Sequence, residues 1–166
     1  TPNLRDFHQT TNLKKVLISV KNGIAKSKSL DLQLPIFLKI APDISKNDLK
    51  QIIETANENN ISGLIISNTT VDRNKELQSD NLHETGGLSG IPLFNKSTNF
   101  LALASKIIKI KKYNLYLIAA GGVSDSKSAY AKILCGAHLV QLYSSMTFDG
   151  PLIAENILKG LLQLMN

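Results

Sequence analysis

The fold class follows most directly from one stretch of the sequence, Leu115-Tyr116-Leu117-Ile118-Ala119-Ala120-Gly121-Gly122. Its first six residues form a short apolar run, typical of a buried strand, and the two glycines predict a tight turn directly after it. Amphipathic helices are predicted on both sides, over residues 99–112 and from about Asp125 to Cys135, before Gly136. A strand between two helices is the repeating unit of a parallel α/β sheet.

The same alternation extends over the whole chain. Further strands are predicted at residues 35–40, 63–68 and 138–142, and further helices at 13–24, from about 43 to 56 and from about 151 to 164. Only a polar, glycine-containing loop at 71–96 interrupts it, and no linker divides residues 1–166, which we expect to form a single segment. A full eight-stranded barrel needs about 250 residues. Two architectures therefore remain: a small open doubly wound sheet, or the second half of a barrel.

The composition is that of a folded, basic chain. Hydrophobic residues make up 43% and charged residues 19%, so the chain is able to bury a core. No apolar run approaches the roughly 18 residues that cross a bilayer. The net charge of +6 permits nucleic acid or anionic lipid as a partner, but aromatic residues are only 5%, which argues against a base-stacking surface. Because the chain begins with Thr1 rather than methionine, we expect it to belong to a longer protein.

Cysteine and histidine do not indicate a metal or disulfide site. Cys135 is the single cysteine, and its apolar neighbours favour a thiol packed in the core. His8, His83 and His138 are too scattered along the sequence to predict a metal site. The lysines are spread over several predicted helices, and we interpret them mostly as a solvated face.

Unusual residues instead lie near the carboxyl ends of the predicted strands, where ligands collect in parallel α/β folds. In the first strand, alternation places Leu38 and Ile40 on one face and Lys39 on the other. If the aliphatic face meets the helices, Lys39 points to the opposite side of the sheet or into a barrel, where an ammonium needs an anion or several acceptors. A surface lysine or a structural ion pair is an equal alternative.

Three further stretches are binding candidates. Ser67-Asn68-Thr69-Thr70 offers hydrogen bonds to a planar ligand, although taken alone it favours a turn. The loop Gly86-Gly87-Leu88-Ser89-Gly90 would let backbone amides approach a ligand, and its spacing also suits a mobile tip. Gly121-Gly122 and Tyr143-Ser144-Ser145 follow the last two strands, the position of the recurrent phosphate site of barrels, so we favour phosphate binding over a simple turn.

Taken in order, five motifs resemble the C-terminal half of dihydroorotate dehydrogenase, in its quinone-using class 2. They are Phe37-Leu38-Lys39-Ile40-Ala41-Pro42-Asp43, Ser67-Asn68-Thr69-Thr70, Thr85-Gly86-Gly87-Leu88-Ser89-Gly90, Ala120-Gly121-Gly122-Val123 and Gln141-Leu142-Tyr143-Ser144. Thr1-Pro2-Asn3-Leu4-Arg5 also resembles the segment after the catalytic loop of that class, with Asn3 where glycine is common. The resemblance implies the C-terminal half of a (β/α)₈ barrel, about four β/α units, that binds FMN at the strand ends.

The resemblance also implies residue roles. Lys39 would lie beside the flavin ring and stabilise its anionic reduced form, and Ser67 would contact the flavin. Asn68 and Thr69 would bind the orotate ring. The remaining FMN contacts would come from Gly90, Gly122, Tyr143 and Ser144, the last three near the phosphate. The loop at 71–96 would form part of the cover over the substrate.

The implied activity is oxidation of (S)-dihydroorotate to orotate with quinone as acceptor, in de novo pyrimidine (UMP) biosynthesis. No catalytic base is expected within this chain, because the family's base serine would lie about three positions upstream of Thr1. We therefore expect residues 1–166 alone to be inactive. The N-terminal half of the barrel and a quinone-admitting, membrane-associated part would also lie upstream, with the complete protein on the cytoplasmic face of the bacterial inner membrane and no nucleic-acid partner.

Two alternatives remain open at this point. One is a different FMN barrel, such as a tRNA dihydrouridine synthase, for which a basic surface would be suitable. The other is a non-catalytic half-barrel remnant that binds phosphate or acts as a scaffold. A half-barrel would expose two sheet edges and an apolar inner face, so we expect the isolated chain to dimerise or to need its other half.

Overall fold

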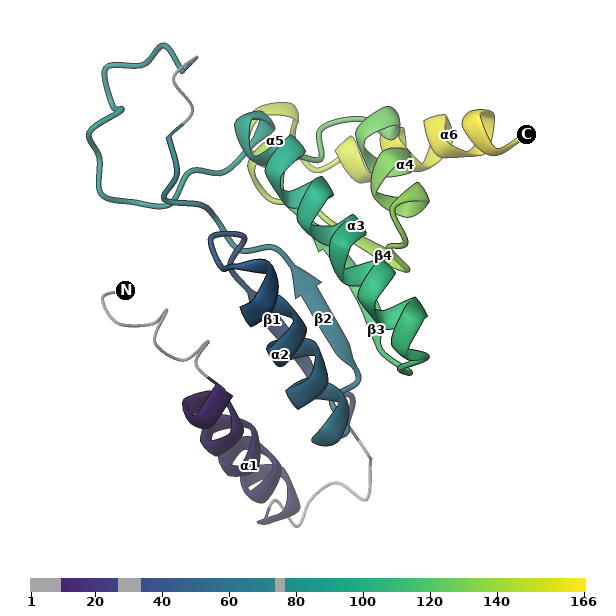
Figure 1. The fold of residues 1–166 in the computed structure, drawn as a ribbon. Coiled ribbons are helices and arrows are strands. Elements are labelled where there is room, and N and C mark those ends of the chain that lie inside the picture. Colours follow the sequence, from purple (N-terminus) through teal and green to yellow (C-terminus); the bar gives the residue numbers. More distant parts are fainter. Residues whose placement is uncertain (1–9, 27–33, 74–76) are drawn as a thin grey trace.

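The computed structural model describes residues 10–26, 34–73 and 77–166 (Figure 1). The strands are β1 (Phe37–Ile40), β2 (Gly63–Ile66), β3 (Tyr116–Ala120) and β4 (Leu139–Gln141). The helices are α1 (Thr10–Lys26), α2 (Lys46–Glu58), α3 (Phe94–Lys111), α4 (Ser126–Leu134), α5 (Ser144–Asp149) and α6 (Ile153–Met165), with a short 3₁₀ helix, η2, at Ile91–Leu93. The Thr1-to-Arg5 motif and His8 lie outside the described residues.

The four strands form one parallel sheet in the order β1-β2-β3-β4. Because a crossover between parallel strands is right-handed, a sheet that always grows in one direction places its crossover helices on one face. A doubly wound sheet instead reverses its order at a switch point and carries helices on both faces. The sequential order therefore decides between the two architectures, and the chain forms four consecutive β/α units of a barrel.

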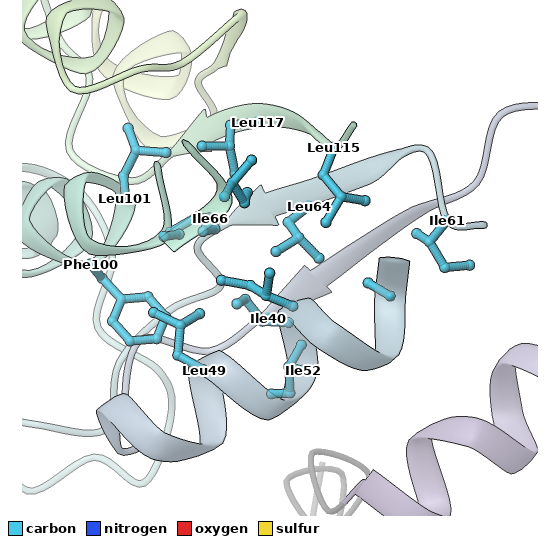
Figure 2. Close-up of a cluster of buried hydrophobic side chains, with 14 of the residues drawn as sticks. Ile40, Leu49, Ile52, Ile61, Leu64, Ile66, Phe100, Leu101, Leu115 and Leu117 are labelled. Carbon is cyan, nitrogen blue, oxygen red and sulfur yellow. The ribbon is translucent and has the colours of Figure 1, made fainter. Parts of the chain in front are cut away.

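The main core lies between the sheet and helices α1, α2 and α3. Ile40 and Ile66 are in register on neighbouring strands and are fully buried. Figure 2 shows these side chains close to Leu49 and Ile52 of α2, with Leu101 of α3 on the β3 side. Alternation along each strand thus directs one set of apolar residues at the helices. A second, smaller cluster joins α4 and α6 through Val123, Ala129, Ile153 and Ile157.

No helix of the described residues covers the opposite face of the sheet. A register row of Lys39, Ile65, Ile118 and Leu139 crosses this face. Leu139 is 61% exposed, and Tyr116 on the same side is 53% exposed. Strands β1 and β4 each pair with a single neighbour among the described residues. The predicted open edges and apolar inner face are therefore confirmed for the part of the chain that the structure describes.

Several predicted element ends are also confirmed. Ser45 and Asp48 form a capping box at the start of α2, where the Asp48 N–H donates to Ser45 Oγ over 3.1 Å. Lys109 and Lys111 lie in the last turn of α3, the negative end of the helix dipole. Cys135 is half-buried and packs against the main core, as predicted for a structural thiol. Within the described ranges no helix is long and apolar enough to cross a membrane.

The main differences from the prediction concern α3 and α5. Helix α3 begins at Phe94 rather than near residue 99, so the predicted loop at 71–96 is shorter. The apolar period was hidden there because the first inward-facing position after Leu93 and Phe94 is Ser97, a polar residue that is fully buried. Helix α5 was not predicted, since its six residues are too few to show a helical period.

A polar network fastens the loop after β2 to the end of β1 and to α3. The Lys96 ammonium lies 2.6 Å from Asp43 Oδ1 and 3.2 Å from Asp72 Oδ2. Asp43 also accepts hydrogen bonds from the Thr70 hydroxyl and, over 3.0 Å, from the Val71 N–H. Burial alone would raise the pKa of Asp43, but the bonds from Lys96, Thr70 and Val71 hold this pKa below its ordinary value. The charged carboxylate therefore stabilises the network.

We expect Asp43→Asn to lower the free energy of unfolding of the complete protein by about 1–2 kcal/mol at pH 7, because it weakens hydrogen bonds to a charged group. The pKa of Asp43 is lower in the folded state, so its contribution is full above about pH 3.8 and is lost as the pH falls through the folded pKa. Urea unfolding at pH 7, 5 and 3 should show a smaller difference in unfolding free energy between wild type and Asp43→Asn at pH 3 than at pH 5 or 7. Asp72→Asn, whose carboxylate is 69% exposed, should cost less at every pH.

Candidate functional site

A cavity of about 560 Å³ lies at the carboxyl ends of the four strands. Residues from all four strand ends and from the loop before η2 line it, because the strands are parallel and end at the same edge of the sheet. The eight residues to which the resemblance assigns a cofactor or substrate contact all line this cavity: Lys39, Ser67, Asn68, Thr69, Gly90, Gly122, Tyr143 and Ser144. Of the other binding candidates, Thr70, Gly86, Gly87, Leu88 and Ser145 do not line it. Its volume is in the usual range for small-molecule and cofactor sites.

The first two strands supply the charged and polar side chains. Lys39 is exposed on the inner face of β1 and reaches the cavity rather than the helix layer. Backbone bonds fix the chain just after β2: the Ser67 N–H donates to Ala120 O over 3.0 Å, and the Asn68 N–H donates to Ile40 O over 2.8 Å. The Ser67 side chain is 3% exposed, and its hydroxyl donates to Asn68 O. Asn68 and Thr69 are thereby held at the cavity wall.

The loop after β2 is tied back over this wall. Thr70 and Leu88 form an antiparallel bridge, with the Leu88 N–H 2.7 Å from Thr70 O. The Arg73 guanidinium donates to the carbonyl oxygens of Glu84, over 2.9 Å, and Gly86. Gly87 packs so closely on the Thr69 side chain that no Cβ would fit. These bonds hold the Gly86–Gly90 stretch beside Thr69 rather than leaving it as a free tip.

The turn after β3, Gly121-Gly122, and the start of α5 at Ser144, after β4, lie side by side, and we call them the glycine cradle. Gly121 and Gly122 have φ of +103° and +76°, which side-chain-bearing residues rarely adopt. A Cβ on Gly122 would lie 2.6 Å from the Phe94 backbone nitrogen, so the turn is closely packed from behind. Ser144 begins α5 and its hydroxyl lies 3.0 Å from Ser89 Oγ, joining the cradle to the loop.

This donor set suits a phosphate group. Short loops after two adjacent strands, with a short helix starting beside them, are the usual phosphate site of a barrel. Here Gly122 and Ser144 supply a backbone turn and a hydroxyl, and Ser145 Oγ donates to Val123 O over 2.8 Å, which fixes α5 against the turn. Tyr143, 84% exposed, stands at the rim. The residues present therefore fit a ligand that carries a phosphate group, such as FMN.

One residue of this region was missed from the sequence. Lys132 on α4 is fully buried, and its ammonium lies 2.6 Å from Ser97 Oγ and 5.0 Å from the centre of the Phe94 ring. Burial lowers the pKa of Lys132 to about 8. The interpretation of the lysines as a solvated face is therefore wrong for Lys132. Its place three residues after the buried Ala129, on the inward side of the predicted helix, was the available signal.

The described residues contain no group of three or more histidines, cysteines or acidic residues that could hold a metal ion. His138 instead has a structural contact, since its Nδ1 accepts the Leu117 N–H over 3.0 Å. His8 lies outside the described part of the chain, and the absence of a histidine metal site stays a prediction.

Curated relatives share this sequence at substantial identity. The chain is 42% identical over 166 residues to "Dihydroorotate dehydrogenase (quinone)" of Bartonella tribocorum, covering 99% of this chain and 45% of that protein. The protein of the same name from Parvibaculum lavamentivorans is also 42% identical, over 161 residues, covering 97% of this chain and 44% of that protein. The chain thus spans about half the length of the curated relatives it matches.

Solved structures agree with the fold. Ligand-free DHODH from Eimeria tenella superposes with a TM-score of 0.92 at 32% identity, covering all of this chain and 48% of that one. The same enzyme in complex with ferulenol gives a TM-score of 0.91 at 31% identity. The family model described as "Dihydroorotate dehydrogenase" matches residues 1–165. With that match over almost its whole length, the chain belongs to the dihydroorotate dehydrogenase family.

Proposed function

We propose that the complete protein uses FMN to oxidise (S)-dihydroorotate to orotate, with a quinone as electron acceptor, in de novo pyrimidine synthesis. The observation that carries the proposal is that eight residues expected from the family motifs line one cavity at the strand ends. Relatives at 42% identity are named for the quinone-dependent reaction. This support favours the dihydroorotate reaction over that of a tRNA dihydrouridine synthase and over a non-catalytic remnant.

The proposed cofactor contacts divide by chemistry. When bound, FMN would supply a hydride acceptor for the carbon oxidised in dihydroorotate. The Lys39 ammonium would stabilise negative charge on the ring, since it lines the cavity from the inner face of the sheet. Ser67 would contact the ring, and Gly90 would let the backbone approach the nucleotide. Gly122, Tyr143 and Ser144 would hold the phosphate end.

The proposed substrate contacts come from the stretch after β2. The Asn68 amide and the Thr69 hydroxyl would bind the polar edge of the planar ring, next to the flavin. Asn68 Oδ1 already accepts the Thr69 N–H over 2.9 Å, which orients its amide group. The base that removes the proton from dihydroorotate is assigned to a serine outside residues 1–166, as are quinone entry and attachment to the cytoplasmic face of the bacterial inner membrane.

The direct test measures orotate formation at its ultraviolet absorbance, with purified complete protein, dihydroorotate and a soluble quinone. We expect quinone-dependent turnover and a yellow protein with bound FMN. Residues 1–166 expressed alone should show none, because they lack the proposed base. A complete protein that stays colourless after incubation with FMN, or that forms no orotate, would contradict the proposal.

Lys39→Met in the complete protein should lower the rate of flavin reduction by dihydroorotate at least about a hundredfold, because it removes the charge proposed to stabilise the reduced ring. Stopped-flow absorbance of the flavin measures this rate. The matched control is Lys50→Met on the exposed side of α2, which should leave the rate unchanged. An unchanged rate in Lys39→Met would remove this residue from the proposed site.

Gly122→Ala should lose most of its FMN during purification, because a Cβ there meets the Phe94 backbone and the φ of +76° is strained for alanine. The ratio of flavin to protein absorbance gives the occupancy. Gly86→Ala provides the control, since its added Cβ meets no atom within 4 Å. Full flavin occupancy in Gly122→Ala would show that the cradle is not the binding element.

A further inference from the structure

A buried lysine lies directly behind the glycine cradle. Lys132 comes from α4 and Ser97 from α3, and both side chains are fully buried. The ammonium donates to Ser97 Oγ over 2.6 Å and faces the Phe94 ring. Phe94 is also the residue whose backbone leaves no space for a side chain at Gly122. Lys132 therefore contacts both residues that support the cradle.

Ser97 passes this contact on to the turn itself. Its hydroxyl oxygen is 3.0 Å from Gly121 O and 3.1 Å from Phe94 O. Because Ser97 Oγ accepts a hydrogen bond from the Lys132 ammonium, the hydroxyl proton of Ser97 is available for one of these two carbonyls. A hydroxyl that accepts from an ammonium is polarised and becomes a better donor. The Gly121 carbonyl oxygen is the nearer of the two acceptors, and its contact with Ser97 turns it toward the core, away from the cavity that Gly121 and Gly122 line.

The direction of one carbonyl fixes the direction of the next N–H. In a trans peptide unit the C=O of one residue and the N–H of the following residue point to opposite sides. With the Gly121 carbonyl held by Ser97 on the core side, the Gly122 N–H is directed to the cavity side. The contact between α3 and β3 therefore sets the orientation of a donor in the cradle.

The lysine is unfavourable for folding by itself. No ion pair to a carboxylate is formed by Lys132 within the described residues, and Phe94 and Ser97 only partly replace water around the ammonium. An uncompensated buried charge costs stability, and a negative ligand nearby reduces that cost. A phosphate bound at the Gly121–Gly122 turn would be such a ligand, because electrostatic attraction is strong where water is excluded.

We propose that Lys132 is a positioning residue for the phosphate of the flavin nucleotide, which orients the Gly122 N–H through Ser97 and adds positive charge behind the cradle. This inference rests on the proposed function, since it takes the cradle as the phosphate end of an FMN site. It assigns Lys132 no contact with the flavin ring or with dihydroorotate. Its effect is therefore specific to ligands that carry a phosphate.

The test compares FMN with riboflavin, which has the same ring but no phosphate. Binding to flavin-depleted complete protein is followed by quenching of flavin fluorescence. We expect Lys132→Met to weaken FMN binding roughly ten- to a hundredfold, as for loss of a hydrogen bond to a charged group, and to change riboflavin binding less than about twofold. The melting temperature of the flavin-free variant should be equal to or above that of wild type, because a buried charge is replaced by an apolar chain.

Ser97→Ala is the second variant, and it tests the proposed positioning role if Lys132→Met does not fold. It removes the link to Gly121 and should also weaken FMN binding about tenfold while sparing riboflavin. Ser105→Ala is the matched control, because Ser105 is a buried serine of the same helix at 5% exposure and should leave both affinities unchanged. If Lys132→Met and Ser97→Ala weaken the binding of FMN and riboflavin equally, or leave FMN binding unchanged, the inference is overturned.

Failure of the proposed function can be separated from failure of this inference. If wild-type complete protein binds neither flavin, the FMN proposal fails, and the role of Lys132 is then judged with inorganic phosphate alone. Stabilisation of wild type by phosphate in a thermal melt, lost in Lys132→Met and kept in Ser105→Ala, would support the positioning role. Stabilisation that persists in Lys132→Met, or none in wild type, would overturn it.

Discussion

The site depends on the parallel pairing of four strands in sequential order. Since each crossover is right-handed, the sequential order sends the crossover helices to one face and brings every strand's carboxyl end to one edge. Lys39, Asn68, Gly122 and Ser144 are far apart in sequence, yet they line the same cavity. Lys39 lies one residue before the end of β1, and the other three follow strands. The chemistry of the site is thus distributed over four β/α units, and one unit alone supplies only a fraction of the contacts.

The strand period of two divides the sheet into a folding face and a ligand face. The side toward the helices carries Ile40, Ile66 and Ala119, all fully buried in one apolar core. The other side carries the row that begins with Lys39, where a charge is tolerated because water or a ligand meets it. In β1, therefore, neighbouring residues serve the apolar core and the cavity in turn. A substitution on the cavity side of the strand leaves the packing of the core unchanged.

Local signals in the sequence were enough for the strands and most helices, whereas they marked the cavity residues only as candidates, and the family resemblance selected among these. Lys39 is visible as a charged residue within an otherwise apolar strand, and Gly121-Gly122 as a turn after a strand. Contacts between distant residues were not predictable in the same way. Lys96 and Asp43 are 53 positions apart, and Lys132 and Ser97 are 35 apart, so only the packing of α3 against its neighbours brings them together. The missed α5 and the early start of α3 have local causes, a short helix and a buried serine at an apolar position.

The distribution of buried polar side chains marks the site independently of any motif. Most of the buried polar side chains of the described residues lie after a strand end or support the turn that follows one: Ser67, Thr70, Ser97, Lys132 and Ser145. The other two, Thr55 and Ser105, lie within helices α2 and α3. The main helix–sheet core contains few such groups, since a buried polar atom there must find a partner and gives no ligand contact in return. A site that binds a charged, planar ligand needs oriented donors, and orienting a backbone N–H requires a fixed carbonyl on the opposite side of its peptide plane. A ligand-binding role for the cradle, as proposed above, would account for the polar layer behind it.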